Sequence, residues 1–254
     1  MNLIKHLANL GYGSRKEMQK LIRMGLITDA AGAVLDAASE PAHEDIRLNE
    51  KPLDPDFGEV LMLNKPTGYV CSLKDRGQLV YDLLPSRFAQ RKPVLSTIGR
   101  LDSATSGLLL FTDDGDFLHK IISPKNHVAK IYEITCARPL EPQYGEIFAS
   151  GTLVLNEEKD ALKPAFLEVT GETTARLTLY EGRYHQVRRM FAAVGNHVET
   201  LHRAQMGDLT LGALKPGKWR ILSAEERAGL LTRPEAAQAR RTSGGVQSHA
   251  DKSQ

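Results

Sequence analysis

Apolar residues at the start of the chain recur at helical spacing. Leu3, Leu7 and Leu10 fall on one face of a helix, which predicts an amphipathic helix over residues 2–10. Two glycines follow directly and should end this helix. The chain is therefore expected to open with a short helix that has one face to bury.

The first turn of a second helix is also readable. Ser14 followed three residues later by Glu17 is a capping-box pattern, in which each side chain accepts from the other residue's backbone N–H. We expect this helix to run to Met24 and to stop at Gly25. Its apolar stripe is Met18, Leu21 and Ile22, and its outward residues are Arg15, Lys16, Lys20 and Arg23. The outward face should thus be basic.

Short apolar runs bounded by turn residues predict the strands. They lie at residues 26–28, 33–35, 46–48, 60–63, 108–111, 131–135, 166–169 and 175–179. Residues 51–58 are rich in Pro, Asp and Gly and indicate a linker, while 117–122 and 185–194 are predicted helices. Because strands and helices mix without a regular βαβ rhythm, we expect an α+β protein. A small N-terminal domain would precede a larger one built on a mixed, largely antiparallel sheet with flanking helices.

These patterns divide the chain into three parts. Residues 1–57 form the small domain and its linker, 58–232 the large domain, and 233–254 a tail that has almost no bulky apolar residues and is predicted to be disordered. A hydrophobic content of 41% with 25% charged residues is ordinary for a globular protein. Since no apolar run reaches ~18 residues and no signal-peptide layout is present, we expect a cytoplasmic protein without membrane spans.

The cysteines and the net charge exclude few kinds of chemistry. Cys71 and Cys136 fit no metal or redox spacing and are expected to be reduced thiols. The net charge of +2 permits RNA binding without requiring it. Its distribution is uneven, because residues 1–25 carry five basic and one acidic residue, whereas 26–57 carry two basic and eight acidic ones. A basic N-terminal patch is therefore backed by an acidic segment.

The strongest chemical signal is the nonapeptide Gly-Arg-Leu-Asp-Ser-Ala-Thr-Ser-Gly at residues 99–107. It places Asp102 in a polar loop between two glycines, directly before the apolar run at 108–111. Single catalytic carboxylates occupy such loops when both ends are rigidly held. Taken alone, Asp102 fits a loop or capping role somewhat better, so its interpretation depends on partners elsewhere in the chain.

Three further sequence motifs supply such partners. The pattern Gly-Arg-Leu-Asp-x-x-Thr-x-Gly resembles the catalytic motif of the pseudouridine synthases, specifically the branch that contains the RsuA-type enzymes of the ribosomal small subunit and their large-subunit relatives. Residues 63–72, 130–134 and 181–190 are similar to the other motifs of that family, in the same order and spacing. The segments 156–160 and 163–165, with Arg-Tyr-His-Gln at 183–186, favour the small-subunit type over the large-subunit types.

The resemblance implies an isomerase that converts uridine in RNA to pseudouridine and needs no cofactor, since nothing is oxidised or added. Asp102 would stabilise or capture an oxocarbenium-like sugar, or help to remove a sugar proton. Tyr132 matches the family's tyrosine, which can stack on a base and mediate proton transfer, although a core aromatic is the alternative. Arg188 matches the basic residue that pairs with the catalytic carboxylate. No residue spacing indicates a metal ligand; His185 in particular lacks a second ligand at suitable spacing.

Basic residues supply the candidate RNA contacts. These are Arg100, Arg183, His185, Arg189, Lys65, Arg15, Lys16, Lys20 and Arg23. Lys65, with Pro66, is expected chiefly to shape the floor of the site. Residues 1–50 resemble the S4 RNA-binding domain, although Asn-Leu-Ile-Lys at 2–5 departs from the usual Arg-Leu-Asp-Lys opening. For the cations of the second helix and for Arg183, His185 and Arg189, plain surface charge is the alternative interpretation.

The expected substrate is a uridine at the family's site in small-subunit 16S ribosomal RNA. It would be presented by structured RNA or by an assembling particle and flipped out of its stack by a monomeric enzyme. Two alternatives stay open: a target in large-subunit 23S RNA, or an RNA-binding ribosome assembly factor whose catalysis is dispensable.

Overall fold

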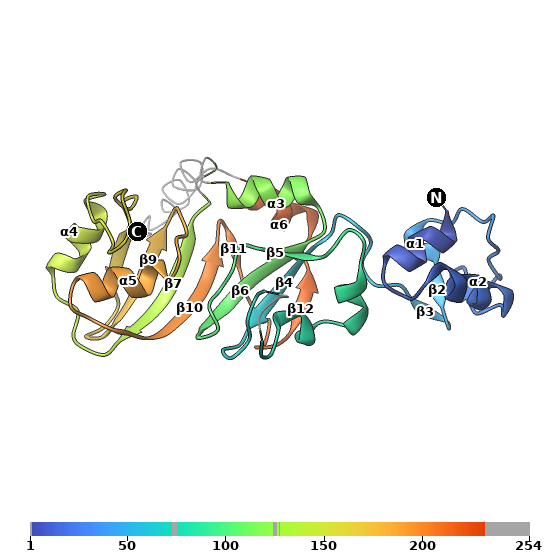
Figure 1. Cartoon of the computed structure of the whole chain (residues 1–254), viewed down its shortest axis with the longest axis horizontal. Coiled ribbons are helices and arrows are strands. Elements are labelled where there is room, and N and C mark those ends of the chain that lie inside the picture. The colour runs from blue at the N-terminus through green and yellow to red at the C-terminus, as the bar shows by residue number, and fades with distance from the viewer. Residues whose placement is uncertain (1, 73–75, 124–125, 127, 232–254) are drawn as a thin grey trace, which may run out of the picture. The chain divides into compact units, whose positions relative to one another are not determined.

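The computed structural model describes residues 2–72, 76–123, 126 and 128–231 of the chain (Figure 1). The tail predicted to be disordered, at 233–254, lies outside these residues. The chain divides into two compact units. The first comprises residues 1–103, 109–118 and 214–222, and the second comprises the remainder.

The first unit opens with the two predicted helices, α1 (Leu3–Asn9) and α2 (Arg15–Arg23). The predicted capping box is present, because Ser14 N–H donates to Glu17 Oε2 over 2.6 Å and Glu17 N–H donates to Ser14 Oγ over 3.3 Å. The small core beneath these helices consists of Leu3, Leu7, Met18, Ile27 and Ile46, all fully buried. Local sequence pattern thus determines both helices and the side that each one buries.

A three-stranded antiparallel sheet completes this part, in the order β1 (Ile27–Thr28), β2 (Arg47–Leu48) and β3 (Lys51–Pro52). The short 3-10 helix η1 (His43–Asp45) precedes β2. The predicted strand at 33–35 is wrong, since only an isolated bridge joins Val34 to Thr28. Conversely, β3 lies in the predicted linker. Asn49 and Glu50, with φ of 50° and 63°, form a tight left-handed turn that folds β3 back onto β2.

The rest of the first unit contains β4 (Val60–Lys65) and the second half of β6 (Thr105–Thr112). The strand order is β12-β4-β6, and β5 also pairs with β6. The other elements are η2 (Val80–Leu83), η3 (Ser86–Gln90), β5 (Ser96–Ile98), β12 (Trp219–Ile221) and the first half of α3 (Gly115–Ile122). Every residue of β4 is buried, which explains its continuous apolar pattern.

The acidic turn after β6 leads into the predicted helix, α3. Asp114 Oδ1 accepts a hydrogen bond of 3.0 Å from Phe117 N–H and so caps α3. Asp113 accepts from Gly58 N–H over 2.6 Å and lies 3.4 Å from Arg91 Nη2. The two aspartates therefore have separate structural partners.

The second unit carries strands in the order β6-β10-β7-β9-β8. Its elements are β7 (Lys130–Cys136), α4 (Gln143–Ala149), β8 (Phe166–Val169), β9 (Thr174–Leu179), α5 (Gln186–Ala193), β10 (Val198–Met206), β11 (Leu209–Thr210) and α6 (Ala224–Gly229). The pair of β10 with β6 is parallel, whereas β10–β7, β7–β9, β8–β9 and β10–β11 are antiparallel. The predicted mixed, largely antiparallel sheet is confirmed.

Aromatic packing joins the two longer helices of the second unit. Phe191 of α5 contacts Phe148 and Tyr144 of α4 edge-on, with ring centroids 5.2 Å and 6.4 Å apart. Edge-to-face pairs of this kind are favourable beyond their buried area. They fix α5, which carries Arg188 and Arg189.

The strand pair β6–β10 depends on one glycine. Gly107 has a φ of +111° and lies in register with Arg203, and a Cβ at this position would collide with the backbone of Arg203. The Arg203 side chain is buried and its Nε donates to Leu108 O over 2.8 Å. The final glycine of the nonapeptide is thus required by close approach of two strands.

Candidate active site

The Asp102 loop is held from beneath by a buried lysine. Lys65, the last residue of β4, is fully buried with 0% exposure. Its Nζ donates to Pro66 O over 3.0 Å, to Asp102 O over 3.1 Å and to Ser103 O over 3.4 Å. The ammonium therefore fixes the backbone of the residue predicted to be catalytic. This position fits the expected role in the floor of the site, and contact of Lys65 with RNA stays a prediction.

Two further contacts tie the same loop to the segment after β4. Gly68 N–H donates to Ser103 O over 2.8 Å. Leu101 N–H donates to Cys71 Sγ over 3.4 Å, and the Cys71 thiol donates to Leu101 O over 3.3 Å. The motif block at 63–72 is thus the physical support of the block at 99–107. The half-buried Asp102 follows the exposed Arg100, so both border on solvent.

Tyr132 lies in the middle of β7, in the second unit. It is 8% exposed and stands in register with Leu177 of β9 and Arg203 of β10. Lys130, two residues earlier on the same side of the strand, donates from Nζ to Val128 O over 3.0 Å. Burial, together with the nearby charge of Arg203, lowers the pKa of Lys130 from 10.5 to about 8. Sequence reasoning did not single out this lysine, although it belongs to the motif of Tyr132.

Arg188 projects from α5 and donates to two backbone carbonyls. Its Nη1 lies 2.6 Å from Val198 O and its Nη2 lies 3.3 Å from Ala104 O. Ala104 follows Asp102 by two residues in the chain. The guanidinium thus anchors the start of β6 as well as the start of β10, and its pairing with Asp102 stays a prediction.

Arg183 and Arg189, two of the predicted RNA contacts, make internal ion pairs. Glu158 accepts from Arg183 Nη1 over 3.3 Å and from Arg189 Nη1 over 2.9 Å. Arg183 also donates to Glu181 and to the carbonyls of Asp160 and Ala161, while Arg189 donates to the carbonyls of Asn156 and Tyr184. The Arg189 hydrogen bond and the two guanidinium charges lower the pKa of Glu158. The two arginines therefore hold the loop at 156–161, and their contact with RNA stays a prediction.

His185 begins α5 in a left-handed backbone conformation, with a φ of 48°. Its ring stacks on Tyr184, with centroids 3.9 Å apart and an interplanar angle of 17°. Tyr184 is 68% exposed and was not selected from the sequence. The exposed Tyr184 ring, backed by the half-buried His185, offers a stacking surface for a base.

The four basic residues of α2 point outward as predicted. Arg15, Lys16, Lys20 and Arg23 are all exposed, whereas Met18 on the opposite side of the helix is fully buried. The outward orientation expected from the apolar stripe is confirmed, and RNA binding by this face stays a prediction.

The comparison with protein families gives the class to which this protein belongs. Residues 59–193 match the family model described as RNA pseudouridylate synthase. That segment is more than half of the 254 residues, so the chain belongs to the RNA pseudouridylate synthase family and is an isomerase. The resemblance found in the four motif blocks is confirmed.

Individual relatives agree over nearly the whole chain. It is 44% identical over 236 residues to ribosomal small subunit pseudouridine synthase A of Escherichia coli K12, covering 91% of this chain and 100% of that one. The protein of the same name from Yersinia pestis is 42% identical over 234 residues, with coverage of 91% and 98%. A crystal structure described as pseudouridylate synthase matches with a TM-score of 0.63 at 37% identity, covering 90% and 98% of the two chains. Within the part of the chain that the structure describes, no helix is long and apolar enough to cross a membrane.

Proposed function

We propose that this enzyme isomerises one uridine to pseudouridine at a specific site in small-subunit 16S ribosomal RNA, with Asp102 as its catalytic carboxylate. The observation that carries the catalytic assignment is the buried Lys65, whose ammonium holds the Asp102 backbone at 3.1 Å. A carboxylate fixed in advance stabilises developing charge without reorganising during the reaction. The small-subunit target rests on the names of the relatives, which match this chain over 91% of its length.

The chemistry needs few groups. The C1′–N1 bond of the uridine breaks, the uracil turns, C5 bonds to C1′ and loses its proton, and N1 gains a proton. Asp102 acts at the sugar, where it stabilises or captures the cationic centre or removes a sugar proton. Arg188 keeps this carboxylate ionised and oriented, and Tyr132 stacks on the base and mediates proton transfer at C5.

RNA binding would combine two kinds of contact. The exposed basic face of α2, with Arg100 beside the catalytic loop, attracts phosphates. Flipping the target uridine out of its stack costs a few kcal/mol, which these contacts offset. In this proposal residues 1–57 are an S4-like RNA-binding domain and 58–232 the catalytic domain. The enzyme works as a monomer in the cytoplasm on structured ribosomal RNA or an assembling small-subunit particle.

Pseudouridine mapping of both ribosomal RNAs, in cells with and without the gene, tests the target. Loss of one small-subunit site is the expected result. Loss of a large-subunit site would keep the chemistry and overturn the target. If neither RNA changes, the ribosomal assignment itself is wrong.

The role of Asp102 is tested with purified protein and the RNA identified by that mapping. Asp102→Asn should lower the rate at least about a hundredfold and leave RNA affinity within about twofold, because the charge acts in the transition state. Asp116→Asn, an exposed aspartate of α3, is the matched control. Full activity of Asp102→Asn would refute the assignment. If this variant lacks activity yet rescues a deletion phenotype, the assembly-factor alternative is favoured.

A further inference from the structure

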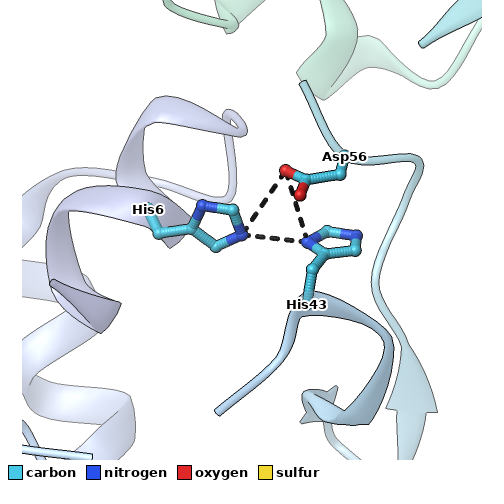
Figure 2. A group of neighbouring side chains, drawn as sticks. All are labelled: His6, His43 and Asp56. Carbon is cyan, nitrogen blue, oxygen red and sulfur yellow. Dashed lines mark hydrogen bonds and ion pairs between the residues drawn. The ribbon is translucent and has the colours of Figure 1, made fainter. Parts of the chain in front are cut away.

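Three side chains outside the proposed catalytic site converge in the N-terminal part of the chain. Figure 2 shows His6 from α1, His43 from η1 and Asp56 from the segment between β3 and β4. His6 Nε2 lies 2.9 Å from His43 Nδ1, and Asp56 Oδ1 lies 3.8 Å from the first nitrogen and 3.6 Å from the second. Two imidazole nitrogens and one carboxylate oxygen thus form a compact triangle.

The dimensions of this triangle suit a small divalent cation. Zn²⁺ bonds to imidazole nitrogen and carboxylate oxygen at about 2.0–2.2 Å, which separates tetrahedral ligand atoms by about 3.3 Å. The three observed separations, 2.9, 3.6 and 3.8 Å, bracket that value. Two imidazoles with one carboxylate is also a ligand set that borderline cations such as Zn²⁺ favour over Mg²⁺ or Ca²⁺.

His43 is oriented as a ligand would be. Its Nε2 lies 2.8 Å from the carbonyl oxygen of Asp54, and a carbonyl only accepts, so Nε2 carries the ring proton. The lone pair of the neutral ring is therefore on Nδ1, which faces His6 and Asp56. Histidines bound to metals usually donate their other ring N–H to such a carbonyl or carboxylate.

His6 is suited to the neutral form that metal binding requires. It is 7% exposed. Burial is the main cause that lowers its pKa, with the charge of Asp56 acting in the opposite direction. Without a cation, its Nε2–H donates to His43 Nδ1. Coordination would shift this proton to the other ring nitrogen without changing the charge of the ring.

The surrounding charges leave the carboxylate of Asp56 facing the imidazoles. Arg87 makes an ion pair with Asp54, and Arg91 Nη2 lies 3.4 Å from Asp113 and donates to Pro55 O over 2.8 Å. These three carboxylates and two guanidiniums sum to one negative charge, which a cation would balance. Asp56 is also 41% exposed on its side chain, so water can complete the coordination.

We propose that His6, His43 and Asp56 form a structural site for a divalent transition cation, with Zn²⁺ as the best chemical match and water as the fourth ligand. The cation would fasten the segment that leads into β4 to the first helix and to η1. It takes no part in the isomerisation, and the site is independent of the proposed function.

The test uses full-length protein without an affinity tag, stripped of metal and returned to chelator-free buffer. Zn²⁺ is titrated by calorimetry, and Co²⁺ serves as an absorption probe of tetrahedral coordination. We expect one Zn²⁺ per chain and a rise in Tm of about 5 °C at a hundredfold excess of zinc over its Kd. Absence of both stoichiometric binding and a zinc-dependent Tm shift overturns the proposal.

Substitutions then assign the ligands. His43→Gln and Asp56→Asn should each weaken Zn²⁺ binding at least about tenfold and remove the tetrahedral Co²⁺ spectrum. His119→Gln, an exposed histidine of α3, is the matched control and should bind like the wild type. Unchanged affinity in His43→Gln and Asp56→Asn would place the metal elsewhere and refute the site. Because the wild-type titration needs no substitution, a variant that fails to fold does not decide the outcome.

Discussion

Two basic regions of this enzyme look alike in sequence and are used in opposite ways. The four cations of α2 are exposed and point away from a buried apolar stripe. Arg183 and Arg189, at the start of α5, turn toward Glu158 and toward backbone carbonyls of the loop at 156–161. The first region presents its positive charge to solvent, whereas the positive charge of the second region is paired within the fold.

The difference shows that a basic cluster cannot be interpreted without its acidic partners. Glu158 precedes Arg183 by 25 residues, so no local pattern reveals the pairing. Only cations that face solvent can release counterions from RNA phosphates and thereby make affinity depend on salt. Cations that face inward should instead affect stability. Four predictions test this division.

The largest effect is expected for Lys65→Met, because Lys65 is the most deeply buried of the inward cations. The carbonyls of Pro66, Asp102 and Ser103 would lose their shared donor, which should cost about 3 kcal/mol of unfolding free energy. The loosened Asp102 loop should lower the rate at least about a hundredfold. Chemical denaturation and single-turnover kinetics measure both, with the exposed Lys215→Met as control. If Lys65→Met has the unfolding free energy and the rate of the wild type, the Asp102 loop keeps its conformation without Lys65.

Lys130 should make stability depend on pH in the alkaline range. Its folded pKa of about 8 lies below its ordinary 10.5, so between these values the unfolded chain binds more protons and stability rises with pH. Below pH 8 the cost of burying the charge is fully present, and above 10.5 it is gone. Relative to Lys130→Met, the wild type should gain on the order of 2 kcal/mol across this window. Denaturation curves of both proteins at several pH values measure it; parallel pH profiles would contradict the shift.

Arg183→Ala separates the structural role from the RNA-binding role. Loss of its two ion pairs and two carbonyl contacts should cost about 2 kcal/mol, while the salt dependence of RNA binding should not change. The control is Arg176→Ala, which breaks an exposed pair with Glu133 and should cost less than about 1 kcal/mol. A fall of about one in the slope of log affinity against log salt would instead return Arg183 to the RNA contacts.

The smallest effect on stability is expected at α2. Lys16→Gln and Lys20→Gln should each change the unfolding free energy by less than about 0.5 kcal/mol. Each should weaken RNA binding and lower the salt slope by about one. Lys51→Gln, an exposed lysine of β3, serves as the control in filter-binding measurements at several salt concentrations. Slopes equal to that of the control would remove α2 from the RNA interface.

Local pattern predicted the elements whose apolar residues are periodic, and it failed where tertiary contacts replace that pattern. Strand β10 is the clearest case. It reads Val-Glu-Thr-Leu-His-Arg-Ala-Gln-Met, yet it is central in the sheet. Some of its polar residues bond to the neighbouring strand β6, as when His202 Nδ1 shares a 2.9 Å hydrogen bond with Ser106 Oγ. A strand of this kind cannot be recognised without its partners.

The candidate site, like the fold, was predictable only in part. The four motif blocks named Asp102, Tyr132 and Arg188, but the contacts between blocks came only from the fold. Cys71 was expected to be merely a reduced thiol, and it binds both backbone groups of Leu101. The cluster of His6, His43 and Asp56 spans 50 residues with no recognisable spacing, so sequence reasoning had no signal for it.

Gly107 affects how the nonapeptide should be interpreted when it is found in related sequences. Since the backbone of Arg203 excludes any side chain at this position, an inactive descendant would have to keep the glycine in order to fold. Such a descendant could lose Asp102 freely. Within this short motif, the presence of the glycine therefore indicates only that the fold was inherited. The presence of the aspartate is what indicates that selection still maintains the reaction.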